Sequence, residues 1–202
     1  MIRAIVSDIG GVLIRTENHS GRIKLEQQYH LPSGGADTIV FNSPPARAST
    51  IGLEPDQAVW DYVAKTLSLS KTDLDRFQNQ FWSGDELDQA LLDFFQGLRP
   101  DYITALLSNA WMNFRLVLER DFGIIEGKTV DHLLISSELG ILKPNPEIFQ
   151  VLSNRLEIDF QQILFIDDFI ENIEAAKELG IQTIHYQKGL DLIYEIKLRL
   201  FQ

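Results

Sequence analysis

The chain has 202 residues, of which 45% are hydrophobic and 23% charged, an ordinary balance for a globular protein. It contains no cysteine, which excludes disulfides and thiolate metal sites and is typical of a reducing compartment, so we expect a cytoplasmic protein. A net charge of −11 argues against nucleic acid as a partner, because a phosphate backbone requires basic surface. We also expect no membrane partner, since no apolar run approaches the length of a membrane span and the N-terminus lacks a secretory signal pattern.

The first predicted element is a strand over residues 2–6, an apolar run that leads directly to Asp8. Gly10 and Gly11 follow, and a glycine pair lets the backbone approach a ligand closely. In open α/β sheets, ligands bind beyond the carboxyl ends of the strands. We therefore expect Asp8 to lie where chemistry takes place.

Residues 15–98 contain no convincing strand and carry apolar residues at helical spacing. Turn-forming residues at 33–35 and 43–45 interrupt the pattern, and we interpret residues 44–47 as a loop that contacts substrate. The whole stretch predicts an all-helical cap inserted between the first two core strands. We assign one aromatic group to the core of this cap: Phe77, Phe81, Trp82, Phe94 and Phe95.

Strands and helices alternate after residue 98. Strand patterns cover residues 103–107, 132–135, 163–166 and 182–186, and helical patterns cover 113–120, 146–156, 170–179 and 190–200. Such alternation predicts a parallel sheet with helices on both faces. We expect an α/β, Rossmann-like three-layer core with a five-stranded parallel sheet, formed by residues 1–14 and 99–202, and a cap formed by residues 15–98.

Polar residues follow four of the five predicted strands. Ser108 follows the second strand, Lys143 lies after the third, and the pair Asp167 and Asp168 follows the fourth. Taken singly, Ser108 is typical of a helix N-cap and Lys143 of a solvated surface. Taken together, these residues follow successive strands and would lie at the same edge of a parallel sheet. They therefore predict a common site.

Three carboxylates in one site repel each other unless a cation neutralises them. The donors here are hard oxygens, with no cysteine in the chain and no histidine in these segments, which favours Mg²⁺. A serine hydroxyl, backbone N–H groups and a lysine suit the oxygens of a phosphoryl group. An aspartate can act as the nucleophile and form an aspartyl-phosphate.

These strand-end residues resemble the four signature motifs of the haloacid dehalogenase-like (HAD) hydrolase superfamily. The helical insertion also lies where this family has its α-helical cap. The closest resemblance is to phosphatases with glycine two residues after the nucleophile, including glucose-1-phosphate phosphatases. The matching segments are residues 8–13 (DIGGVL), 107–109 (LSN), 139–149 (LGILKPNPEIF) and 165–180 (FIDDFIENIEAAKELG).

The resemblance implies a Mg²⁺ site. Asp8, the carbonyl of Gly10 and Asp168 would be ligands of the metal. Asp167 would bind it directly or through water, and Asn172 would support the ligands from outside.

The resemblance also implies the groups that act on the phosphate. Asp8 would attack phosphorus, while Ser108 and the backbone of Asn109 would hold the phosphate. Lys143 would neutralise charge between the phosphate and Asp8. The substrate would be a small phosphorylated metabolite, such as a sugar phosphate.

Gly10 departs from the family pattern, because most phosphatases of the superfamily carry a second aspartate there as general acid and base. General acid–base help is worth ~10²–10⁴-fold in rate. The enzyme would then be slow, restricted to good leaving groups, or supplied with a proton by the cap, the substrate or water. Arg15, Glu17 and His19 follow the first motif and are candidates to reach the cleft.

Two other functions remain open on this fold. A 2-haloacid dehalogenase would use the same aspartate to attack carbon without a metal, but the pair Asp167 and Asp168 favours a metal. A catalytically weak binding or regulatory protein is the third reading, suggested by Gly10.

Overall fold

The computed structural model describes residues 1–201. Five parallel strands form one sheet in the order β5-β4-β1-β6-β7, which confirms the predicted Rossmann-like core. The first strand lies in the middle, so the residue that follows it is flanked by the ends of both neighbouring strands. The strands are β1 Ala4–Ser7, β4 Ile103–Ser108, β5 His132–Ile135, β6 Ile163–Asp167 and β7 Gln182–His185.

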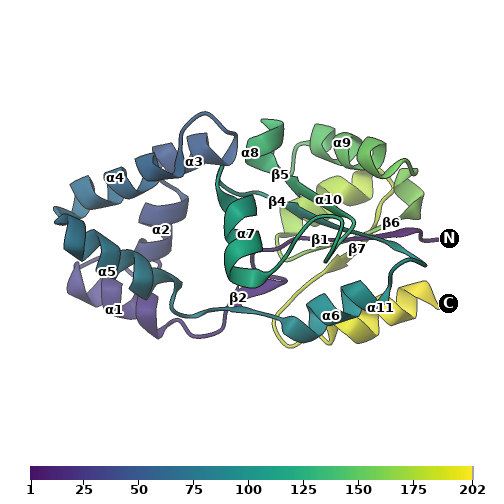
Figure 1. The fold of residues 1–202 in the computed structure, drawn as a ribbon, viewed down its shortest axis with the longest axis horizontal. Helices are drawn as coiled ribbons and strands as arrows, with labels where there is room; N and C mark the ends of the chain where they lie inside the picture. The colour runs from purple at the N-terminus through teal and green to yellow at the C-terminus, as the bar shows by residue number, and fades with distance from the viewer. Residues whose placement is uncertain (202) are drawn as a thin grey trace.

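The sheet is the middle of three layers (Figure 1). Successive side chains of a strand point to opposite faces, so Ile5 enters one apolar cluster and Val6 enters another. Helices α6 Gln89–Gly97, α7 Phe114–Phe122 and α11 Leu192–Leu200 contribute to the cluster of Ile5. Helices α9 Pro146–Leu156 and α10 Ile170–Glu178 contribute to the cluster of Val6. Two short helices, α8 Ser136–Leu139 and η1 Phe160–Gln162, complete the core.

The predicted helix over residues 146–156 matches α9, and its ends have identifiable causes. Asn145 is the N-cap, whose side chain accepts a hydrogen bond from the Glu147 N–H, and Pro146 occupies the first helical position. Helix α10 ends just before Gly180, whose φ of 84° is a conformation that glycine adopts without strain.

Five helices build the cap, separate from the sheet at one end of the molecule (Figure 1). They bury their own apolar cluster, in which Leu25, Val40, Val63, Phe77 and Phe81 are at most 1% exposed. Their bounds are α1 Ser20–Gln28, α2 Gly35–Phe41, α3 Pro44–Thr50, α4 Asp56–Leu67 and α5 Lys71–Trp82.

The interpretation of residues 44–47 as a loop is wrong, because they form the first turn of α3. The side chain of Ser43 accepts a hydrogen bond from the Ala46 N–H, and Pro44 occupies a first-turn position that needs no N–H. The breakers in this segment therefore start a helix.

A small antiparallel ribbon connects the cap to the core, which the sequence did not predict. It pairs β2 Ile14–Thr16 with β3 Asp85–Leu87. Helix α6 follows it, and Phe95 of α6 lies in the same cluster as Ile5, with Phe94 packed against that cluster. The assignment of Phe94 and Phe95 to the cap is therefore wrong. We propose that the cap comprises residues 17–84, with the ribbon as its connection to the core.

No helix in residues 1–201 is both long and apolar enough to cross a membrane.

Candidate active site

Four charged side chains meet at the carboxyl end of the sheet. This end of the sheet faces the cap (Figure 1). Asp8 follows β1, Asp167 is the last residue of β6, and Asp168 comes next. Lys143 reaches them from the loop between α8 and α9. The parallel topology thus brings together residues that are more than a hundred positions apart in the chain.

Lys143 joins two of the carboxylates. Its ammonium lies 3.0 Å from Asp8 Oδ1 and 2.7 Å from Asp167 Oδ2, and it donates to the Leu107 carbonyl at 2.8 Å. Its side chain is 0% exposed. An ammonium has three protons, so each one has an acceptor, as a buried charge requires.

Asp167 is fully buried and has every oxygen engaged. Its Oδ1 accepts from the Phe169 N–H at 2.8 Å, its Oδ2 accepts from Lys143, and Asn172 Nδ2 lies 3.0 Å from both oxygens. These contacts suit a residue that holds Lys143 in place.

Asp168 has the opposite environment. It is half-buried, and its Oδ1 is buried without a hydrogen-bond partner among the described residues. A buried oxygen of this kind is costly unless something binds it. Gly11 makes room for this carboxylate: a Cβ there would lie 2.1 Å from Asp168 Oδ2, and φ is 78°. A larger residue at position 11 would therefore displace Asp168.

The three carboxylates fit a hard divalent cation. Asp8, Asp167 and Asp168 each offer an oxygen within 4.8 Å of the others, and the oxygen of Asp168 without a partner is the donor that a cation would satisfy. The pKa of Asp8 is raised from 3.8 to about 7, chiefly because burial disfavours the charged carboxylate; Lys143 lowers this pKa and the charge of Asp167 raises it. Burial and Asp167 also raise the pKa of Asp168. A cation would favour the ionised carboxylates, and oxygen ligands of this kind suit Mg²⁺.

Ser108 and Asn109 lie at the end of the neighbouring strand. Ser108 is 3% exposed and ends β4, two residues beyond Leu106, which pairs with Ser7. Asn109 is exposed, and its amide makes two hydrogen bonds of 2.8 Å with the main chain of Lys143. The structure thus connects the segments after β4 and β5 through one side chain.

The candidates for a proton donor are not among the groups that meet at Asp8. Arg15 donates to the Val12 carbonyl and pairs with Glu17 and Asp88. The hydrogen bond from Arg15 lowers the pKa of Glu17, which keeps that carboxylate ionised at neutral pH. His19 is exposed at the start of α1.

The sequence did not single out Ser136, which is 0% exposed beside this site. Its hydroxyl accepts from the Ala110 N–H at 3.0 Å and donates to the Thr50 carbonyl of the cap at 2.7 Å. No local pattern marks such a residue, because its partners come from two distant segments.

Comparisons with known proteins identify the family of the chain. The model of the haloacid dehalogenase-like hydrolase family matches residues 2–180. D-ribitol-5-phosphate phosphatase of Bacteroides thetaiotaomicron is 30% identical over 99% of both chains. A HAD-family enzyme from the same species, solved with magnesium and inorganic phosphate, has a TM-score of 0.76 at 25% identity and covers 100% of both chains. L-2-haloacid dehalogenase of Xanthobacter autotrophicus has a TM-score of 0.66 at 18% identity, over 100% of this chain and 84% of its own, which shows the fold alone.

Proposed function

Because the chain belongs to the haloacid dehalogenase-like hydrolase family, we propose that it is a Mg²⁺-dependent phosphatase that cleaves phosphate monoesters through an aspartyl-phosphate on Asp8. One observation carries this proposal: the ammonium of Lys143 joins Asp8 to Asp167, beside an Asp168 oxygen that no described protein group satisfies. That arrangement supplies a positioned nucleophile, a fixed positive charge and an oxygen ligand for a cation.

Asp8 is the nucleophile. Its Oδ1 accepts from the Ile9 N–H at 2.6 Å and contacts Lys143, so the carboxylate is fixed before substrate arrives. The ammonium of Lys143 lowers the repulsion between this carboxylate and an anionic phosphate. Ser108 and the N–H of Asn109 hold the phosphate oxygens from the next strand.

Asp8, Asp168 and the carbonyl of Gly10 would hold the Mg²⁺, and Asp167 supports the site by fixing Lys143. When bound, the cation supplies positive charge to the carboxylates and to the phosphate. Gly10 cannot donate a proton, so we expect faster turnover of esters with good leaving groups.

We propose a phosphorylated sugar or polyol as the substrate. The support is the relationship to D-ribitol-5-phosphate phosphatase along the whole chain. Glyceraldehyde 3-phosphate phosphatase of Pyrococcus abyssi also matches, at 32% identity over 60 residues, 29% of this chain and 25% of its own.

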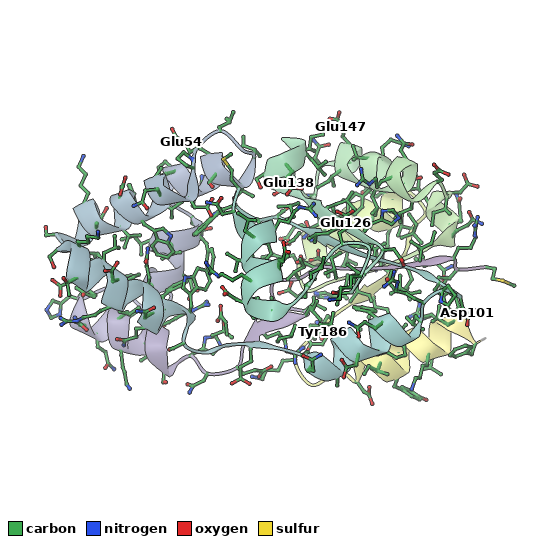
Figure 2. The ribbon with its side chains drawn as sticks, viewed as in Figure 1. Glu54, Asp101, Glu126, Glu138, Glu147 and Tyr186 are labelled. Carbon is green, nitrogen blue, oxygen red and sulfur yellow. The ribbon has the colours of Figure 1, made fainter. Side chains whose placement is uncertain are left out.

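The test is release of phosphate from an aryl phosphate, with Mg²⁺ and with a chelator. We expect turnover only with the metal and a loss of at least about 10³-fold in Asp8→Asn, which removes the nucleophile. The matched control is Asp101→Asn, an exposed carboxylate at the end of the core remote from the cap (Figure 2). Undiminished turnover in Asp8→Asn, or none in the wild type with any metal, would exclude the proposal.

A further inference from the structure

The side chain of Asn109 holds the main chain of Lys143 at both of its polar groups. Asn109 Nδ2 donates to the Lys143 carbonyl, and Asn109 Oδ1 accepts from the Lys143 N–H, each at 2.8 Å. We propose that Asn109 is a positioning residue, which acts on the phosphatase reaction by setting where Lys143 stands. This inference rests on the proposed function.

The position of the Lys143 backbone matters because the ammonium group at the end of the side chain is held by three partners. All three acceptors of Lys143 come from fixed elements: Asp8 after β1, Leu107 in β4 and Asp167 in β6. A flexible side chain satisfies three such acceptors only when its Cα is correctly placed. A shift of the loop would therefore break contacts with the nucleophile and with Asp167.

The loop that carries Lys143 has few other restraints at this point. Gly140 donates to the Ser136 carbonyl and Asn145 donates to the Leu142 carbonyl, at the two ends of the loop. Between them, Asn109 holds both polar groups of the Lys143 backbone. A primary amide offers a donor and an acceptor in one plane, as a neighbouring strand would. Aspartate at position 109 could not supply both, because an ionised carboxylate only accepts hydrogen bonds.

Asn109 also follows Ser108 directly, so one short segment serves both sides of the site. In the proposed function, the backbone N–H of Asn109 binds the phosphate. The side chain of Asn109 fixes the position of the Lys143 main chain. The Asn109 N–H and the Lys143 ammonium, which both interact with the phosphate, are thereby held at a fixed position relative to each other. Such fixed positions are a geometric condition for fast phosphoryl transfer.

Asn109→Ala tests the proposal, because the residue is exposed and its truncation opens no buried cavity. We expect kcat for an aryl phosphate to fall about 10- to 100-fold, as when other outer supports of a site are removed. The Mg²⁺ concentration for half-maximal activity should stay within about twofold, since Asn109 acts through Lys143 and not through the metal. Asn113→Ala is the matched control: this exposed asparagine makes no side-chain cap and should retain wild-type kcat.

A double-mutant cycle separates action through Lys143 from an independent role. Lys143→Met keeps the apolar stem and removes the ammonium. Adding Asn109→Ala to it should cost less than about threefold further, because the group being positioned is already gone. A double variant slower by the product of the two single effects would overturn the proposal, as would an Asn109→Ala enzyme as fast as the wild type.

Asn109→Asp gives a second test should Lys143→Met fail to fold. The aspartate keeps the acceptor for the Lys143 N–H but loses the donor to the carbonyl, and its backbone N–H is unchanged. We expect weaker inhibition by inorganic phosphate together with a lower kcat, and a wild-type inhibition constant with wild-type kcat would refute the idea. A wild type without phosphatase activity would refute the proposed function instead, so the two failures are distinguishable.

Discussion

Adjacent residues at this site have different environments, although the sequence repeats the same residue type. Asp167 has all its oxygens engaged, whereas Asp168 keeps a buried oxygen without a partner in residues 1–201. Gly11 lies against Asp168 and excludes any side chain, whereas a Cβ at Gly10 would meet no atom within 4 Å. Of the two neighbouring aspartates, Asp168 is therefore the one with an oxygen free to bind a ligand, and of the two neighbouring glycines, Gly10 is the one that can accept a side chain.

Gly10→Asp should restore the missing proton donor. The open space at Gly10 admits the side chain, so we expect faster turnover of alkyl phosphates, whose leaving groups need a proton, by up to about 10²-fold. Turnover of aryl phosphates should change little. The measurement is the ratio of the two rates, and an unchanged ratio would mean that the proton already comes from elsewhere. Gly11→Ala is the opposing control and should lose activity, because its Cβ would displace Asp168.

Asp8 should make the metal-free protein less stable as pH rises. Its pKa is about 7 in the folded protein against an ordinary value of 3.8, so the folded state binds more protons between these values. The free energy of unfolding therefore falls as pH rises through this window, and the fall is complete above pH 7. Relative to Asp8→Asn, we expect a loss on the order of 3 kcal/mol between pH 5 and pH 8.

Urea unfolding of both proteins in a chelator measures this difference. Mg²⁺ should reduce it, because a cation favours the ionised carboxylate. Parallel pH profiles for the wild type and Asp8→Asn would contradict the argument.

At the scale of elements, the cap and the core meet along a narrow seam. The Thr50 carbonyl at the end of α3 accepts from Ser136, and Asp56 of α4 accepts from the Asn113 N–H at the start of α7. Gly52 lies between them with φ of 76°, and a Cβ there would lie 2.3 Å from the Ser137 carbonyl. Hydrogen bonds and close backbone contact therefore join the cap to the core at this point.

The two neighbouring serines of α8 should respond differently to alanine. Ser136→Ala leaves the Ala110 N–H and the Thr50 carbonyl without their partner, which costs about 1–3 kcal/mol. The Ser137 hydroxyl is buried without a partner among the described residues, so Ser137→Ala should be neutral or slightly stabilising. Urea unfolding measures the free energy of unfolding of both variants. Equal losses of this free energy in the two variants would contradict the roles given to the two serines.

The sequence predicted the core better than the cap, for a physical reason. Buried parallel strands are continuous apolar runs, and the polar residues that follow them, such as Ser108 and Asp167, mark the site directly. The start of α3 was missed because Pro44 and Pro45 signal either a loop or a first helical turn. Helix α6 was assigned to the wrong apolar cluster, since spacing shows that Phe95 is buried but not against what. The hydrogen bonds of Asn109 to the Lys143 main chain, and those of Ser136 to Ala110 and Thr50, depend on tertiary contacts that no local pattern encodes.

At the scale of the whole molecule, the chain has separate apolar cores. The cluster of the cap shares no buried residue with the two clusters that flank the sheet. Trp111, from the loop after β4, packs against the cap cluster, with its ring centroid 5.9 Å from those of Trp60 and Phe41. All three tryptophans, at positions 60, 82 and 111, lie in this one aromatic group. Tryptophan emission therefore reports on the cap and its contact with the core.

A matched pair of phenylalanines tests whether the cap unfolds as its own unit. Phe77 in the cap and Phe149 in the core are both 0% exposed, and truncation of either to alanine should cost about 3–5 kcal/mol. In Phe77→Ala, the tryptophan emission should change at lower urea, together with the part of the far-ultraviolet ellipticity that the cap helices contribute. The rest of the ellipticity should be lost at higher urea, because the sheet keeps its own clusters when the cap unfolds. In Phe149→Ala, the ellipticity should shift to lower urea, since this ring packs on Phe165 of β6. A single transition, in which the whole ellipticity and the tryptophan emission change together, would instead mean that cap and core form one cooperative unit.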